Sequence, residues 1–197
     1  MMKIFIIPTV RKRHKDQIEY CVDERIFLLL KKTFKKFEVK SKLTSSVNLI
    51  IILGGNNLTS IEKNQENKIK EKLSNQAFFY GLGKKIPILG ICGGAQFLAK
   101  KYNSKIVRTS GHVGSHSIIW NNKNFFSKKT TLPKRVNSYH NYKIIKLSKK
   151  FTLDAFTKDG SIELFSSKIN ELYGIMWHPE RNKPISKFDT ELLKKIK

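Results

Sequence analysis

The sequence has few acidic residues, cysteines and prolines. Its 197 residues include 15 Asp and Glu, against 39 Lys and Arg, with only 2 Cys and 5 Pro. The two cysteines, Cys21 and Cys92, lie far apart, so they cannot form a disulfide framework and match no paired metal-ligand spacing. We therefore expect no metal site, and a reducing cytoplasm as the location of the protein.

Long hydrophobic runs are also missing. The longest candidate, residues 49–53, falls far short of the roughly 18 apolar residues that a membrane span needs, and the apolar start of the chain is too short for a signal peptide. We therefore expect no contact with a membrane. Because 40% of the residues are hydrophobic, the chain can still bury an ordinary core, which excludes disordered and collagen-like classes. The length favours a single domain over residues 1–197.

The net charge of +24 has two interpretations. A surplus of this size often indicates a nucleic acid or another polyanion as partner, but lysines spread evenly through a chain also arise from composition alone. No stripe of basic residues with interleaved aromatic residues is present, so nucleic acid is not the expected partner. The charge favours an anionic small molecule, especially a phosphate ester.

Apolar runs alternate with amphipathic segments in the first half of the chain, which is typical of βαβ units and an open, mostly parallel sheet flanked by helices. Strands are predicted near residues 3–8, 49–53 and 86–91, and helices near 16–36, 59–75 and 92–100. After residue 102, turn residues separate short predicted strands at 105–108, 117–120, 135–138, 162–165 and 172–177. These indicate a small antiparallel portion, followed by a helix over 185–197. The fold class is therefore α/β.

The segment from Gly90 to Gly94, Gly-Ile-Cys-Gly-Gly, has the G-x-C-x-G pattern of a nucleophile elbow. It lies where a buried strand turns directly into a helix. Glycines two positions before and after Cys92 allow this strained turn, and the amide dipoles of the new helix favour the thiolate. The backbone N–H of Gly93 is well placed to stabilise an oxyanion. The alternative is a buried structural cysteine followed by packing glycines.

A thiolate nucleophile needs a base, and His178-Pro179-Glu180 provides a candidate. The proline fixes the backbone so that His178 and Glu180 project from one turn, where the carboxylate can orient the imidazole. The tripeptide follows an apolar run and becomes informative because it accompanies the elbow around Cys92. Together these segments predict a Cys-His-Glu triad.

These segments resemble the class I, or triad, glutamine amidotransferases and the related γ-glutamyl hydrolases. Residues 87–96 resemble the nucleophile segment, residues 173–180 resemble the His/Glu segment, and residues 54–56 resemble the loop that supplies the second oxyanion amide. The resemblance covers about residues 3–182. It implies a flavodoxin-like open sheet, with Cys92 as nucleophile, His178 as acid and base, and Glu180 as the residue that orients it.

The resemblance also implies the surroundings of the substrate. The second oxyanion amide would come from Gly55, with Gly54 as the alternative, and no cofactor would be needed. The expected substrate-binding residues are Gly54, Asn56, Gln96, Asn137, Ser138, Tyr139, His140 and Arg11. Two departures from the family pattern, Met176 in place of a common Gln and the small Gly93-Gly94 pair, are expected to reshape the leaving-group pocket.

The leaving group is the main open question. Segments around Arg11, Glu19 and residues 136–140 resemble freestanding hydrolases of γ-glutamyl conjugates, which need no synthase partner. Within them, the chain resembles the branch that hydrolyses γ-glutamyl-CDP-amidate in capsule biosynthesis, which implies a nucleotide-linked small-molecule substrate. Arg11, Arg13 and either His112 or His116 are then candidate diphosphate contacts. The alternatives are a γ-glutamyl-GABA type of hydrolase, a glutaminase subunit that supplies ammonia to a separate synthase, and a polyanion-binding protein with a degenerate fold.

Overall fold

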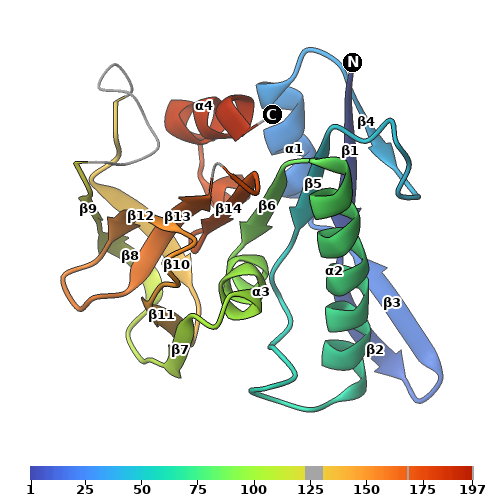
Figure 1. Ribbon diagram of the computed structural model, residues 1–197, viewed down its shortest axis with the longest axis horizontal. Coiled ribbons are helices and arrows are strands. Elements are labelled where there is room, and N and C mark those ends of the chain that lie inside the picture. The colour runs from blue at the N-terminus through green and yellow to red at the C-terminus, as the bar shows by residue number, and fades with distance from the viewer. Residues whose placement is uncertain (123–130, 168, 197) are drawn as a thin grey trace.

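The structure is a computed structural model that describes residues 1–122, 131–167 and 169–196. These residues form an eight-stranded sheet and three two-stranded pairs (Figure 1). In spatial order the large sheet consists of β4 (Phe37–Lys40), β1 (Met2–Ile7), β5 (Leu49–Ile52), β6 (Ile88–Ile91), β14 (Leu172–Ile175), β13 (Ile162–Ser167), β12 (Thr152–Phe156) and β9 (Ile119–Trp120). Strands β4 to β14 of this order are parallel, and β13, β12 and β9 continue the sheet in antiparallel pairing.

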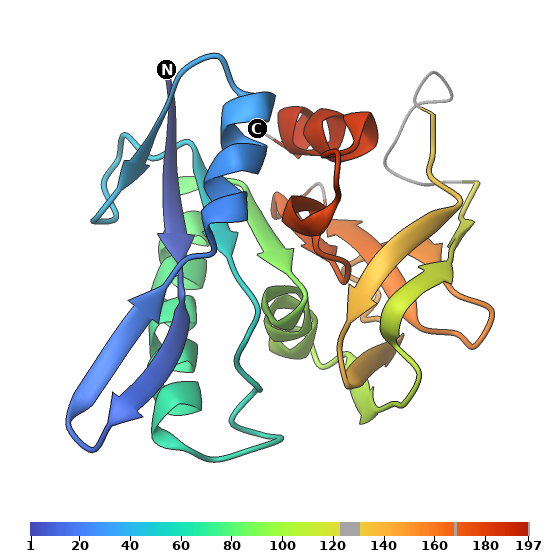
Figure 2. The ribbon, with the colours of Figure 1, turned by 180° about the vertical axis from the view of Figure 1, so that it is seen from behind.

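Helices cover both faces of the sheet. Helices α1 (Glu24–Thr33) and α4 (Lys187–Ile196) lie together on one face, and α2 (Gln65–Lys84) and α3 (Gly93–Lys101) lie on the other (Figure 2). Each face has its own hydrophobic cluster, one including Leu30 and Leu192, the other including Phe78 and Leu98. All four residues of β5 are buried, as expected for a central parallel strand covered on both faces. The α/β fold class is therefore confirmed.

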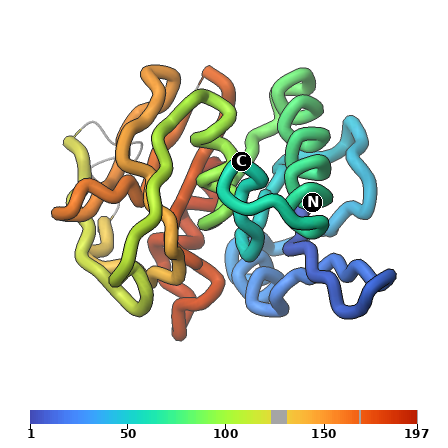
Figure 3. Tube along the Cα trace, turned by 90° about the horizontal axis from the view of Figure 1, so that it is seen from below, coloured from blue at the N-terminus to red at the C-terminus, as the bar shows by residue number. Residues whose placement is uncertain are grey.

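The three small antiparallel pairs extend beyond the large sheet. They are β2 (Thr9–His14) with β3 (Gln17–Cys21), β8 (Val113–Ser117) with β10 (Arg135–Tyr139), and β7 (Lys105–Arg108) with β11 (Tyr142–Lys146). The β2–β3 hairpin lies at one side of the molecule, and the other pairs lie at the opposite side (Figure 3). None of the helices in the described ranges has the length and hydrophobicity that crossing a bilayer requires.

The single helix predicted over residues 16–36 is wrong in its first part. Residues 17–21 pair with β2 as the second arm of a hairpin, and α1 begins only at Glu24, where the Asp23 side chain accepts from the Arg25 N–H. The apolar residues Ile18 and Val22 match a helical spacing by coincidence, because strand pairing across the hairpin satisfies the backbone of this segment instead. Cys21 is accordingly the last residue of β3, and it is half-buried.

The helix predicted near residues 59–75 also begins and ends at other residues. Helix α2 begins after Asn64, whose side chain caps the N–H of Asn67, and it continues to Lys84. The predicted strand at 117–120 divides between β8 and β9, and strands β2, β3, β4, β11 and β12 were not predicted. The strands predicted near 3–8, 49–53, 86–91, 105–108, 135–138, 162–165 and 172–177 are confirmed, as is the C-terminal helix.

Candidate active site

Cys92 lies at the sharp turn between β6 and α3. Its backbone has φ 53° and ψ −108°, a region that residues with a side chain rarely adopt. A Cβ on Gly90 would lie 2.5 Å from the Gly94 carbonyl group, and a Cβ on Gly94 would lie 2.0 Å from the carbonyl oxygen of Ile52. Both glycines of the G-x-C-x-G pattern are therefore required by close backbone packing around the nucleophile position.

His178 and Glu180 come from the segment that follows β14. Strands β6 and β14 are parallel neighbours, so their carboxyl ends bring Cys92 and His178 to the same edge of the sheet. The Nδ1 atom of His178 lies 2.6 Å from Oε1 of Glu180, and Cys92 is close enough to His178 to raise the pKa of its imidazole. The structure thus brings the three side chains of the predicted triad together.

The site shifts the protonation of His178. Burial lowers the pKa of the imidazole, but the hydrogen bonds and charges of Cys92 and Glu180 outweigh burial and raise the pKa to about 9. His178 is therefore a cation at neutral pH, with a proton available for a leaving group. Glu180 is only 5% exposed, and its second oxygen has no hydrogen-bond partner within the described residues.

The loop after β5 lies directly against the nucleophile. A Cβ on Gly54 would be 3.0 Å from the Gly93 nitrogen and 3.1 Å from the Cys92 Cβ. Thr9 Oγ1 donates to the Gly54 carbonyl at 2.8 Å, and Gly55 has φ +89°, with no room for a side chain against Thr9. The loop therefore lies against the start of α3, where Gly93 with Gly55 or Gly54 is predicted to form the oxyanion hole.

Asn137 on β10 holds the backbone of His178 from both sides. Its Oδ1 accepts from the His178 N–H at 2.8 Å, and its Nδ2 donates to the His178 carbonyl at 2.8 Å. Nδ2 also donates to Asn182, which in turn donates to the buried carboxylate of Asp189. The resemblance implied a substrate contact for Asn137, but its side-chain amide is engaged in positioning His178.

Asp189 closes this network from α4. It accepts from the Trp177 indole N–H at 3.0 Å and from the Ser186 hydroxyl at 2.6 Å. Burial raises the pKa of Asp189 despite these donors. Sequence reasoning missed Asp189 and Asn182, and no local pattern marks them, because their role depends on contacts with β10.

Other residues expected at the substrate have internal partners. Asn56 forms two hydrogen bonds with the backbone of Val10, and the Gln96 amide donates to the Tyr142 carbonyl. Ser138 is buried and donates to a backbone carbonyl. The polar groups named here are therefore bonded within the protein.

Tyr139 and Arg11 are the more accessible members of the predicted set. Tyr139 is 44% exposed, and its ring centroid is 5.7 Å from that of His178. The guanidinium of Arg181 lies 4.4 Å from the centre of the Tyr139 ring, which places a cation next to the triad. Arg11 lines a cavity of about 360 Å³, together with Lys12, Gly55 and further polar residues of β2, the 55–57 loop and α2.

Four residues expected near the substrate lie elsewhere. His112 and His116, of which one was expected to contact a diphosphate, lie instead against His140 and Glu163 in the antiparallel part of the fold. The expectation that Met176 shapes the leaving-group pocket is also wrong. Met176 has no exposed surface and belongs to the hydrophobic cluster beneath α2 and α3. His14 is exposed at the end of β2.

Comparisons with known proteins agree with this geometry. Residues 16–196 match the family Glutamine amidotransferase class-I. A Gamma-glutamyl-CDP-amidate hydrolase from Campylobacter jejuni is 36% identical over 135 residues, which cover 68% of this chain and 63% of the relative, so the match leaves more than a third of that relative unaligned. A glutamine-hydrolyzing GMP synthase subunit from Methanococcus aeolicus is 31% identical over 66% of this chain and 73% of its own length.

A solved structure shows the same fold. A glutamine amidotransferase from Thermotoga maritima superposes with a TM-score of 0.68 at 20% identity, covering 98% of this chain and 82% of that one. At this identity the likeness concerns the fold alone. It accounts for the open sheet with its antiparallel extension, which the described residues of this chain share.

Proposed function

Because the chain belongs to the class I glutamine amidotransferase family, we propose that it hydrolyses a γ-glutamyl amide through a thioester on Cys92. One observation carries this proposal. Cys92 occupies the strained elbow, next to His178, whose Nδ1 lies 2.6 Å from Glu180. A thiolate, a proton carrier and an orienting carboxylate in this order make up the machinery of acyl transfer.

The proposed reaction has two steps. The Cys92 thiolate attacks the γ-carbonyl carbon, and the N–H groups of Gly93 and Gly55 stabilise the oxyanion. The C–N bond breaks as the His178 imidazolium transfers its proton to the departing nitrogen. Water then attacks the thioester while His178 takes up a proton, the C–S bond breaks, and L-glutamate leaves. No cofactor takes part.

For the leaving group we favour cytidine diphosphoramidate, released from γ-glutamyl-CDP-amidate for capsule modification. The Campylobacter jejuni relative supports this choice, since its name states that substrate. Arg11 and Lys12 line the cavity beside Gly55, and Arg181 lies next to Tyr139. These cations are available to bind the diphosphate of the leaving group. The net charge of +24 has the same sign.

A second candidate is a glutaminase subunit that passes ammonia to a separate synthase. The Methanococcus aeolicus relative supports it, because the name of that protein describes one subunit of a GMP synthase. The same triad would act, with ammonia as the leaving group. The two candidates differ in whether the chain works alone and in whether free glutamine is a substrate.

The test is hydrolysis by the purified chain, with γ-glutamyl-CDP-amidate, γ-glutamyl-GABA and glutamine compared side by side. Phosphorus NMR follows the phosphoramidate, and a glutamate assay follows all three substrates. We expect turnover of the nucleotide substrate and little glutamate from the others. If glutamate appeared only with γ-glutamyl-GABA, the nucleotide substrate would be wrong, but the assignment of the catalytic triad would still hold.

The matched control is Cys92→Ser, which keeps the elbow and removes the thiolate. We expect a loss of at least about 10³-fold in kcat with an unchanged fold by circular dichroism. Wild-type turnover by this variant would refute the assignment of the nucleophile. No hydrolysis of any substrate by the wild type, followed by glutaminase activity when a synthase is added, would favour the second candidate.

A further inference from the structure

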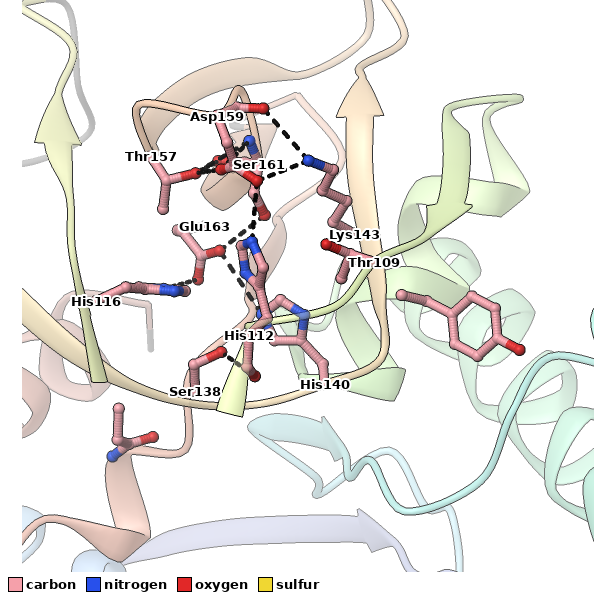
Figure 4. A network of polar contacts seen from close by, with 12 residues as sticks. Thr109, His112, His116, Ser138, His140, Lys143, Thr157, Asp159, Ser161 and Glu163 are labelled. Carbon is pink, nitrogen blue, oxygen red and sulfur yellow. Dashed lines mark hydrogen bonds and ion pairs between the residues drawn. The ribbon is translucent and has the colours of Figure 1, made fainter. Parts of the chain in front are cut away.

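Three histidines and a glutamate meet inside the antiparallel part of the fold, in a cluster outside the triad. His112 precedes β8, His116 lies on β8, His140 follows β10, and Glu163 lies on β13. Figure 4 shows these four side chains turned toward one another. Ligand atoms of His112, His140 and Glu163 all lie within 4.8 Å of one another.

Three members of the cluster are buried, and several of their polar atoms have no hydrogen-bond partner. His112 is 6%, His140 4% and Glu163 0% exposed. Within the described residues, the atoms without a hydrogen-bond partner include Nδ1 of His112 and both ring nitrogens of His140. Glu163 forms ion pairs with His116, at 3.3 Å, and with His140, at 3.7 Å. A buried polar atom without a partner is destabilising, so a group of them indicates a ligand that satisfies them together.

We propose that His112, His140 and Glu163 bind a zinc ion. Imidazole nitrogens and one carboxylate oxygen are ligands that Zn²⁺ prefers, and three protein ligands leave the fourth tetrahedral position to a water molecule. Two ligands at about 2.0–2.1 Å from a tetrahedral zinc ion lie about 3.3 Å apart. The ligand atoms of His112, His140 and Glu163 lie within 4.8 Å of one another, and Nε2 of His140 lies 3.7 Å from Oε1 of Glu163. Nε2 of His116 lies 3.3 Å from the other carboxylate oxygen, Oε2.

The surroundings of the cluster also match a metal site. Nε2 of His112 faces Asp159 Oδ2 at 3.0 Å, which leaves Nδ1 to coordinate the ion. Such a carboxylate–histidine pair commonly orients an imidazole ligand of zinc. Asp159 is itself paired with Lys143, and Glu163 Oε1 accepts from Ser161 at 2.9 Å. Two of the ligands are therefore held in place by partners outside the first sphere.

The zinc ion would join the β8–β10 pair to the main sheet. Neither strand of that pair is hydrogen-bonded into the eight-stranded sheet, whereas β13 is part of it. Strand β10 carries Asn137, which holds the backbone of His178. The metal would thus act on structure and on the placement of β10 rather than in the reaction. The three ligands come from separate segments and none is a cysteine, so the cysteine spacing gave no sign of this site.

The experiment uses the full chain with Cys92→Ser, because Cys92 and His178 could otherwise bind zinc themselves. The protein is stripped with a chelator, reconstituted with ZnCl₂, desalted and analysed for metal by mass spectrometry. We expect about one zinc ion per chain and a rise in Tm of about 5–10 °C over the stripped form. Co²⁺ in place of zinc should give the intense visible absorption of a tetrahedral site.

Two variants in the same background locate the site. Glu163→Gln preserves side-chain size but removes the charge, and it should lower the retained zinc at least tenfold and abolish the rise in Tm. His14→Gln removes an exposed histidine of the β2–β3 hairpin and should behave like the parent. Less than about 0.1 zinc ion per folded parent chain would overturn the proposal, as would equal zinc retention by both variants.

A variant that fails to fold would not leave the question open. The parent protein alone then decides, because a tetrahedral Co²⁺ spectrum supports the site and an octahedral or absent spectrum overturns it. The zinc measurement is independent of substrate turnover, so the proposed function and the zinc site can fail separately.

Discussion

Replacing Asn137 should impair catalysis although this residue does not belong to the triad. Its amide makes two hydrogen bonds to the His178 backbone and one to Asn182, at 2.8, 2.8 and 2.9 Å. At about 1 kcal/mol net for each bond, Asn137→Ala loses up to about 3 kcal/mol. Because Asn137 is half-buried, water can replace part of its hydrogen bonding in the variant, so we expect a net loss of about 2 kcal/mol.

Losing these hydrogen bonds should leave the His178 imidazole less well positioned for proton transfer. A penalty of about 1.4 kcal/mol in the transition state is a tenfold change in rate, so we expect kcat to fall about 10- to 30-fold. KM should change little, because the Asn137 amide is engaged with His178 and Asn182. Steady-state kinetics with the substrate identified by the three-way comparison measures both constants, and urea unfolding measures the loss of stability.

Arg135→Gln is the matched control on the same strand. Arg135 is exposed and bonds only to serines of β8 among the described residues, so its loss should lower stability slightly and leave kcat unchanged. If Asn137→Ala keeps wild-type kcat while folded, the hydrogen bonds from β10 do not position His178. If Arg135→Gln lowers kcat equally, the effect belongs to the β8–β10 pair as a whole.

Two further predictions concern protonation and packing. The pKa of His178 is raised from 6.5 to about 9, so turnover should decline as pH rises through about 9. The stabilisation of the fold by protonated His178 should be complete below pH 6.5 and should be lost as the pH rises through about 9. Glu180→Gln should move the decline in the pH–rate profile to lower pH and reduce kcat at least about 10-fold; an unmoved decline would contradict the pairing. Gly94→Ala should destabilise the chain by about 3 kcal/mol or more, because its Cβ would meet the Ile52 carbonyl at 2.0 Å. Gly83→Ala, with no atom within 4 Å of its Cβ, should instead stabilise α2 by about 0.5–1 kcal/mol in thermal unfolding; similar Tm values for both variants would refute the packing argument.

Local sequence determined the central parallel strands and the elbow. A run such as Leu-Ile-Ile-Ile in β5 fits a strand buried on both faces. Glycines on both sides of Cys92 permit the one turn that exposes a nucleophile at the start of a helix. His178 and Glu180 could be paired in advance because only one residue separates them. In each case the physical cause acts over a few residues, so the sequence pattern carries it.

Contacts across long separations were decided only by the tertiary structure. Residues 17–21 have apolar spacing compatible with a helix, and pairing with β2 selects the strand instead. Asn137 is 41 residues from His178, and nothing near Asn137 in the sequence indicates that its amide is used to hold the backbone of His178. His140 likewise meets Glu163 only because β10 and β13 lie close together in the fold. Backbone groups and buried charges find their partners across the whole fold, so a local sequence pattern cannot specify which partner each one takes.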